Sequence, residues 1–392
     1  MILALKLAYR NLIGAGLRTW LNVIVLSFSF VVIIWMKGIL VGWDHQAKTD
    51  MKNWEIGGGQ YWQETYDPYD PFTLIDAHAK IPVEFNSEIE KGDMVPVLIV
   101  QGTIYPEGRM QSIQIKGINP DQNLLKLPTQ KLDTVVGGAI PAIIGSNMAK
   151  SNKLGVGSYV TIRWRDANGT FDATDIYVTF VFKTTVPTVD VAQVWIPIDS
   201  LRSMTMLPDE ATLVTFRDAE KEHGEIQGWK LKPFKSLVSE IEDMIKAKSV
   251  GQSVFYVILL LLAMLAIFDT QVLSIFRRQR EIGTYIALGY TRREVVGLFT
   301  VEGAMHAILA AALAAVYGIP FLLWQSKTGI SMPVDSGDYG FSIADTMYPL
   351  YSAGLIITTI FIVLITTVVV SYLPAKKIAK MNPTDALRGK LQ

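Results

Sequence analysis

The sequence has no cysteine and is poor in charge, since only 18% of its 392 residues are Asp, Glu, Lys or Arg. Without cysteine it forms neither disulfide bonds nor thiolate metal sites, and it has no cysteine nucleophile. Its 36 basic residues are matched by 36 acidic residues, so it lacks the basic excess of a nucleic-acid-binding protein. Globular proteins average about 25% charged residues, and a mean hydropathy of +0.30 is high for a soluble chain. The composition therefore predicts a membrane protein.

Motifs that carry common catalytic and nucleotide-binding chemistry are missing as well. The chain contains no Gly-x-x-x-x-Gly-Lys-Ser/Thr loop, no Gly-x-Gly-x-x-Gly, no His-Glu-x-x-His and no Gly-x-Ser-x-Gly. Its four histidines are widely separated and lack the spacing of metal ligands: His45, His78, His223 and His306. We therefore expect no catalytic residues, no metal site and no cofactor bound by this chain. If the chain were an enzyme, its active site would have to be assembled from residues that are far apart in the sequence. Such a site shows no local sequence motif.

Four segments are long and apolar enough to cross the hydrocarbon core of a bilayer, which takes roughly 20 residues of helix. The predicted transmembrane helices are 21–43, 251–276, 295–323 and 350–373. Basic residues precede the first segment, as in a signal peptide, but its apolar run is longer and no small-residue cleavage motif follows. We therefore expect an uncleaved membrane anchor.

The distribution of Lys and Arg predicts the orientation of the chain. Segments 1–20, 277–294 and 374–392 are rich in basic residues, whereas the long segment 44–250 is acidic overall. Because cytoplasmic loops carry the excess of Lys and Arg, both termini and segment 277–294 are predicted to be cytoplasmic. The long segment and the short loop 324–349 then lie outside the cytoplasm.

The long acidic segment has the pattern of a folded α+β domain. Runs of β-branched residues at 94–104 and 111–117 flank a Pro/Gly turn, and those at 159–164 and 175–182 flank Asn168-Gly169. Both pairs predict hairpins. The sequence as a whole predicts an α-helical membrane protein with four transmembrane helices. A large extracytoplasmic α+β domain, in two lobes, is inserted between the first and second of them.

Two of the predicted spans carry an ionisable residue, Asp269 and Glu302. Ionisable groups inside a membrane usually mark function. Both residues lie near the cytoplasmic ends of their spans, however, close to Arg277, Arg278 and Arg292 in the sequence. A local ion pair is therefore the favoured interpretation.

The third span also carries a stripe of small residues. Gly303, Ala307, Ala311 and Ala315 recur every four residues, a spacing that lets helices approach closely. The stripe predicts a packing face, either against another span of the same chain or at the seam of a dimer. The sequence leaves both open.

Segment 277–294 has the pattern of a short amphipathic helix that ends and restarts. Gly289 is a helix stop signal, and Thr291 and Glu294 have the spacing of a capping box. The helix of the third span is therefore predicted to begin there. Taken alone, a basic turn at the membrane surface would serve only as a topology anchor.

This segment also carries a resemblance to a known family. Residues 278–290 read RQREIGTYIALGY and resemble the R-x-R-E-I-G-x-x-x-A-L-G motif of the MacB/FtsX/LolCDE permease superfamily of ABC transporters. Residues 5–21 resemble the amphipathic helix that leads into the first span in this family. Residues 372–388 are similar to its closing P-A-x-x-x-A-x-x-x-P-x-[DE]-A-L-R motif. The three motifs occur in the family's order, and the resemblance covers the whole chain.

The resemblance implies a non-catalytic permease subunit that works with two ATP-binding cassette subunits and with a second permease copy or a paralogue. Because the chain has no phosphate-binding loop, ATP and Mg²⁺ would be held by the partner ATPase. Segment 277–294 would be a coupling helix that docks in a groove of that ATPase. The residues expected in this contact are Arg280, Glu281, Ile282, Tyr285, Ile286 and Leu288.

The resemblance further implies lipoprotein release from the inner membrane of a bacterium, with the α+β domain in the periplasm and a lipid or lipoprotein as cargo. Two alternatives stay open: MacB-like mechanotransmission that exports peptides or drugs, and FtsX-like regulation of a cell-wall hydrolase. The long insertion fits the first two better than the third. The hairpin at 165–174 is shorter than the hook with which LolC-type subunits engage a lipoprotein carrier.

Overall fold

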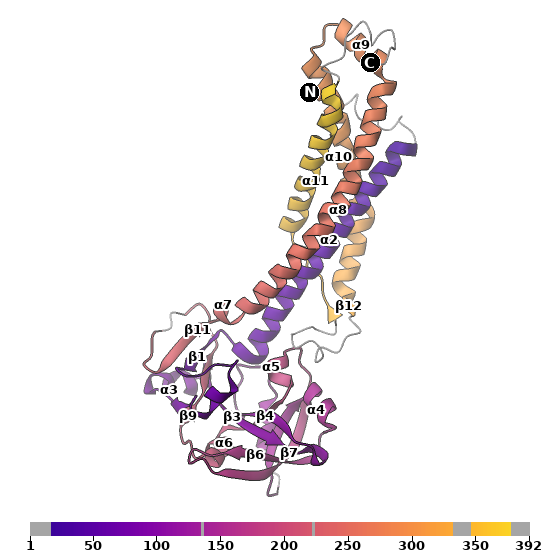
Figure 1. The fold of residues 1–392 in the computed structure, drawn as a ribbon. Helices are drawn as coiled ribbons and strands as arrows, with labels where there is room; N and C mark the ends of the chain where they lie inside the picture. The colour runs from indigo at the N-terminus through magenta and orange to yellow at the C-terminus, as the bar shows by residue number, and fades with distance from the viewer. Residues whose placement is uncertain (1–16, 135–136, 222–223, 332–345, 378–392) are drawn as a thin grey trace. The chain divides into compact units, whose positions relative to one another are not determined.

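The computed structural model describes residues 17–134, 137–221, 224–331 and 346–377 (Figure 1). The chain divides into two compact units. The helical unit comprises Met1–Trp43, Ile245–Ile330 and Met347–Gln392, and the α+β unit comprises Asp44–Met244 and Ser331–Thr346. The predicted N-terminal helix 1–20, the loop 324–349 and the tail 374–392 lie largely outside the described residues.

Four long helices supply most of the helical unit. They are α2 (Leu17–Met51), α8 (Ser239–Arg277), α10 (Arg292–Thr328) and α11 (Ala353–Ala375). All four are long and apolar enough to cross a membrane. The short helix α9 (Gln279–Ala287) connects α8 to α10, and two-residue strands β12 (Ile330–Ser331) and β13 (Thr346–Met347) lie between α10 and α11.

The four helices pack around a shared apolar core. Phe30 of α2, Ile267 of α8, Ala310 of α10 and Val363 of α11 are buried in one cluster. Other faces of the same helices are also apolar but exposed, as at Phe28, Leu265, Val316 and Phe361. A helix that is apolar all round is typical of a span, because lipid rather than water surrounds its outer face.

Helix α10 extends beyond the predicted limit of the third span. The predicted span ends at residue 323, whereas the helix continues to Thr328 with Pro320 in its interior. A proline removes one backbone hydrogen bond from a helix. Helices of membrane proteins tolerate this because neighbouring groups satisfy the freed carbonyl. Pro320 therefore does not end this helix.

The α+β unit is built on one nine-stranded sheet in the described part of the chain, with strand order β11-β1-β10-β3-β4-β8-β5-β7-β6. The strands are β1 (Gly59–Gln63), β3 (Met94–Ile104), β4 (Gln111–Ile118), β5 (Ile140–Gly145), β6 (Tyr159–Arg165), β7 (Phe171–Phe182), β8 (Gln193–Pro197), β10 (Leu213–Phe216) and β11 (Trp229–Pro233). A further pairing joins β3 to β6. The barrel that this pairing closes consists, in spatial order, of β3, β4, β8, β5, β7 and β6.

Shorter elements surround this sheet. A separate pair of strands is formed by β2 (Ala79–Lys80) and β9 (Glu210–Ala211). The helices are α3 (Val83–Glu90), α4 (Ser146–Asn152), α5 (Pro187–Asp190), α6 (Ile198–Thr205) and α7 (Phe234–Leu237). Single turns of other helix types are η1 (Lys52–Ile56), η2 (Pro71–Ile75), η3 (Pro106–Gly108) and η4 (Thr129–Asp133).

Both predicted hairpins are confirmed, but the two predicted lobes share one sheet. Strand β3 pairs antiparallel with β4, and β6 pairs antiparallel with β7 across a turn in which Gly169 has a φ of 84°. Glycine adopts such a conformation without strain. Strand β3 has 11 residues, and it pairs with β10 at its start and with β6 at its end. Because β3 is long enough to pair with both, it belongs to the barrel and also continues the sheet into strands β10, β1 and β11.

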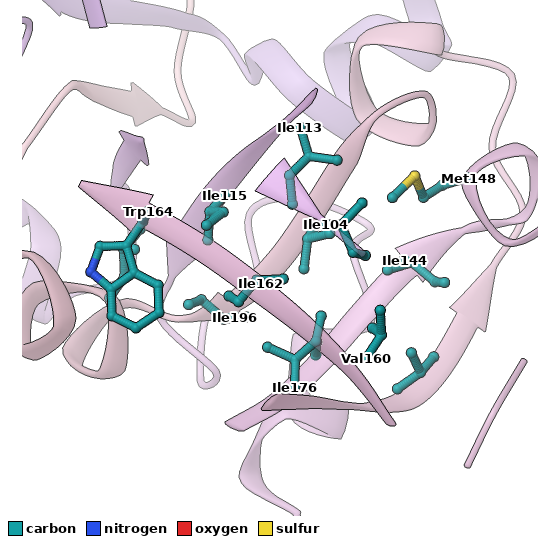
Figure 2. Packing of buried hydrophobic residues seen from close by; sticks show 14 of the residues in the cluster. Ile104, Ile113, Ile115, Ile144, Met148, Val160, Ile162, Trp164, Ile176 and Ile196 are labelled. Carbon is teal, nitrogen blue, oxygen red and sulfur yellow. The ribbon is translucent and has the colours of Figure 1, made fainter. Parts of the chain in front are cut away.

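Alternate residues of the barrel strands fill its interior. Figure 2 shows side chains from different strands that point toward one another, among them Ile104, Ile113, Ile144, Ile162 and Ile176. Successive side chains of a strand face opposite sides of a sheet. The intervening residues Val97, Ile99 and Trp195 therefore belong to a second cluster on the outer face of the barrel.

Candidate functional site

The segment between α8 and α10 folds as the sequence predicts. Helix α9 is followed by Gly289, whose φ of 98° lies in a region that favours glycine. Helix α10 then begins with a capping box: Thr291 Oγ1 accepts from the Glu294 N–H, and the Glu294 carboxylate accepts from the Thr291 N–H at 2.8 Å. Hydrogen bonds from the Thr291 N–H and hydroxyl lower the pKa of Glu294. The stabilisation from this carboxylate is therefore complete at neutral pH and is lost as the pH falls through the lowered pKa.

A Thr291→Ala variant is expected to lower the free energy of unfolding of the helical unit by about 1 kcal/mol, because an N-cap hydrogen bond is lost. Titration with sodium dodecyl sulfate, followed by circular dichroism, would measure the change. Thr300→Ala is the matched control, since Thr300 bonds a carbonyl within α10 and caps nothing. Equal losses in the two variants would contradict the capping role of Thr291.

Helix α9 is packed tightly against its own chain. Ile282 is fully buried in a cluster with Ile275 of α8, Phe299 of α10 and Ala375 of α11. Tyr285 packs against the same cluster, as does its neighbour Ile286. These contacts link α9 to three long helices of the helical unit.

Arg278, in the break between α8 and α9, connects these helices by ion pairs. Its guanidinium donates through Nη1 to both carboxylate oxygens of Glu302, each at 2.9 Å, and through Nε to Glu281 at 2.7 Å. It also lies over the Phe299 ring, 4.9 Å from the centroid. Burial would lower the pKa of Arg278, but the carboxylates of Glu302 and Glu281 outweigh it and raise that pKa. Arg278 therefore holds its charge and joins α9 to α10.

The two ionisable residues of the predicted spans differ in their surroundings. Glu302 is buried and paired with Arg278, which confirms the local ion pair expected for it. Asp269 is exposed on α8, and it has no ion pair with the described part of the chain. The ion pair expected for Asp269 is therefore absent among these residues, because its side chain points away from the helix core.

The six residues predicted to contact an ATPase divide between the two faces of α9. Arg280 and Glu281 are exposed, and Leu288 keeps 73% of its surface exposed. Tyr285 and Ile286 are half-buried, whereas the side chain of Ile282 is fully buried. The exposed face thus combines two charges with one large apolar side chain. The assignment of α9 to ATPase contact stays a prediction.

The small-residue stripe of α10 faces the chain's own helices at one end. A Cβ atom at Gly303 would lie 2.1 Å from Ser371 Oγ of α11 and 3.2 Å from Gln271 Nε2 of α8. Ala307 is buried in the helical core, Ala311 packs against that core, and Ala315 is exposed. Contacts within the chain therefore explain the first part of the stripe, and the dimer seam stays open for Ala315.

Sequence reasoning missed the central place of Arg278, which it named only as one of three pairing candidates. The signal was available in Glu302, because a carboxylate in an otherwise apolar helix needs a cation within reach. It also missed Gln271 and Ser371, two buried polar residues beside Gly303. Within the described ranges no three side chains of His, Asp or Glu are grouped to hold a metal ion.

Comparison with known families identifies the region that contains α9. Residues 253–383 match the family described as FtsX-like permease C-terminal, and this region runs from α8 through α11. This match and the relatives described below support assignment of this region to the MacB/FtsX/LolCDE permease superfamily. This permease is thus of the FtsX/MacB type found in ABC transporters.

Curated relatives of the permease are proteins named macrolide export ATP-binding/permease protein MacB. That of Wolinella succinogenes is 23% identical over 195 residues, covering 48% of this chain and 27% of the relative. Those of Escherichia coli and Burkholderia cenocepacia are 23% and 24% identical, covering 43% and 39% of this chain and 24% and 20% of the relatives. The permease therefore spans about a quarter of the length of these relatives.

A solved structure with some similarity is the extracellular domain of the noncanonic ABC-type transporter YknZ from Gram-positive bacteria. It is 17% identical, and the match covers 40% of this chain and 79% of that one with a TM-score of 0.23. A score this low does not establish a shared fold. The family assignment of the permease rests on the match at residues 253–383 and on the MacB relatives.

Proposed function

We propose that this permease is a membrane subunit of an ABC transporter, and that α9 is the element through which a separate ATPase moves it. The observation that carries this proposal is the two-sided character of α9. One face is joined to α8, α10 and α11 through Ile282 and Arg278, and the other exposes Arg280, Glu281 and Leu288. A helix fixed in this way transmits a displacement to the long helices, whereas a flexible loop would absorb it.

The proposed topology follows from the four apolar helices and the positive-inside rule. Helices α2, α8, α10 and α11 cross the cytoplasmic membrane of a bacterium, and the basic segment 277–294 lies in the cytoplasm with both termini. The α+β unit then lies in the periplasm. Two ATPase subunits would hold ATP and Mg²⁺ and dimerise beneath two permease subunits, either two copies of this chain or this chain and a paralogue.

For the cargo, we propose a lipid-linked protein released from the membrane. The MacB relatives support a second candidate, since their names describe macrolide export. Mass spectrometry of the complex purified from its host distinguishes the two. Acylated protein that copurifies and is released on addition of ATP would favour lipoprotein release. Drug or peptide efflux that depends on the permease, without acylated cargo, would favour export.

The coupling role predicts a large effect from changes on the exposed face of α9. Leu288→Asp and Arg280→Glu are each expected to weaken binding of the ATP-binding subunit about tenfold, equal to about 1.4 kcal/mol. Stimulated ATP hydrolysis should fall with it. Copurification and ATP turnover of the reconstituted complex would measure both.

Val156→Asp is the matched control, because Val156 is similarly exposed but lies in the α+β unit. It is expected to leave ATPase binding and turnover unchanged. The coupling proposal would be falsified if Leu288→Asp and Arg280→Glu assembled and hydrolysed ATP as the unchanged chain does.

A further inference from the structure

A cavity of about 390 Å³ lies on the outer face of the barrel, within the α+β unit. Its floor is apolar and includes Val97 and Ile99 of β3, Trp195 of β8 and Leu213 of β10. Turn η1, helix α5, the first residues of α8 and the segment around Tyr69 form its walls. Cavities of this volume with apolar floors and a few polar groups are typical of sites for small molecules.

A buried lysine is the main polar group of this floor. Lys116 of β4 is only 6% exposed, and its ammonium lies over the Trp195 ring, 5.0 Å from the centroid. An ammonium has three N–H donors. Within the described residues its hydrogen bond is to the Thr188 carbonyl, at 3.2 Å, and no carboxylate lies within 4 Å of it. Burial lowers the pKa of Lys116, and the carboxylate of Glu55 offsets this in part.

The two acidic residues of the cavity, Glu55 and Glu240, each accept a hydrogen bond from a hydroxyl group and not from Lys116. The Glu55 carboxylate accepts a hydrogen bond from the Thr188 hydroxyl at 2.5 Å, so Thr188 stands between it and Lys116. Glu240 is exposed at the rim and interacts with the Tyr69 hydroxyl. The cation at the floor thus keeps unused donors, whereas both acids already have partners. A buried charge without a close counter-ion is unfavourable, and an incoming anion would relieve that cost.

We propose that this cavity binds an amphiphile with an apolar chain and one anionic group, and that Lys116 pairs with the anionic group. The apolar part lies on Val97, Ile99 and Leu213 and exits past Tyr69. A carboxylate or a phosphate satisfies the unused donors of Lys116 equally well. Glu55 opposes the anion by its charge and thereby limits the affinity.

The test compares probes that share one chain and differ in their head group: decanoate, decanol and decylamine. Each is titrated against the full chain in phosphatidylcholine nanodiscs, with binding to empty nanodiscs subtracted. Decanoate is expected to bind saturably and more tightly than the other two. Lys116→Met is expected to weaken decanoate binding about tenfold or more, because a hydrogen bond between charged groups is lost. Glu55→Gln is expected to strengthen it.

Two controls separate the site from general effects on folding. Lys131→Met removes a lysine that also lies over an aromatic ring, that of Phe180, but does not line the cavity, and should leave decanoate binding unchanged. Ile241→Trp fills the cavity from its α8 wall and should abolish the saturable binding. Decylamine that binds as tightly as decanoate, or decanoate binding unaffected by Lys116→Met and Ile241→Trp, would overturn the proposal.

The same titration identifies the source of the ligand. Nanodiscs that contain phosphatidylglycerol present an anionic head group from a bilayer. Displacement of decanoate in these nanodiscs supports a membrane lipid as the ligand. Decanoate binding that persists there supports the proposal with a soluble amphiphile as the ligand.

Discussion

An Arg278→Met variant is expected to lower the free energy of unfolding of the helical unit by about 3–5 kcal/mol. Glu302 retains only 10% exposure of its side chain, and both of its oxygens accept from Arg278 at 2.9 Å. Removal of Arg278 leaves a buried carboxylate without its counter-ion. Glu302→Met is expected to cost less, because Arg278 still pairs with Glu281 at 2.7 Å. Titration with sodium dodecyl sulfate in mixed micelles would measure both losses.

The double variant Arg278→Met, Glu302→Met provides the control for this experiment. It removes both charges, and replacement of a buried ion pair by apolar residues is often neutral. Its free energy of unfolding is therefore expected to lie within about 1 kcal/mol of that of the unchanged chain. If Arg278→Met proved as stable as the double variant, the result would contradict the prediction that Arg278 stabilises the buried Glu302 carboxylate.

A Gly303→Leu variant is expected to lose about 3 kcal/mol or more, at the upper end of the range for overpacked cores. The new Cβ would lie 2.1 Å from Ser371 Oγ and 2.4 Å from Ser371 Cβ, so α10 and α11 have to separate. Thermal unfolding of the purified chain would record this as a large fall in melting temperature, with loss of folded protein in the membrane.

Ala315→Leu is the matched control, since it places the same side chain on the same stripe at an exposed position. It should leave the folding of the single chain unchanged. Loss of a dimer in this variant, measured by size-exclusion chromatography with light scattering, would assign the exposed end of the stripe to a seam between permeases. Equal stability of Gly303→Leu and the unchanged chain would show that α10 and α11 do not pack closely at Gly303.

The structure also changes which substitutions test the coupling segment. The resemblance groups Ile282 with the residues that contact an ATPase, but Ile282 is fully buried among Ile275, Phe299 and Ala375. A charge at this position would report on folding. Leu288 and Arg280 are exposed, so changes there report on docking.

Local patterns in the sequence were sufficient for much of the fold. The four apolar helices, both hairpins, the stop at Gly289 and the capping box of Thr291 and Glu294 were all predictable, because each depends on residues close together in the chain. Helix α10 continues through Pro320 to Thr328, beyond the predicted span 295–323, and where the span itself ends stays a prediction.

Lys116 shows what such patterns leave undecided. Ile113 and Ile115 of β4 point into the barrel, so Lys116 between them and Gly117 faces away from its interior. A polar residue on an outer face normally meets water. Here that face is covered by η1 and α5, which lie far away in the sequence. Whether an outer face is solvated or forms the floor of a cavity depends on these distant segments.

The amino-acid sequence alone predicts a charge-poor chain with four membrane-length helices, an α+β insertion and the motifs of a permease superfamily. Composition, periodicity and short motifs are local properties, so they can be read without coordinates. Three features are visible only in the folded chain: Arg278 joins Glu281 to Glu302, Ile282 is buried while Leu288 is exposed, and Lys116 lies in the floor of a cavity. Each of these features is a contact between side chains of different elements. Which side chains come into contact depends on how segments that are distant in the sequence pack together.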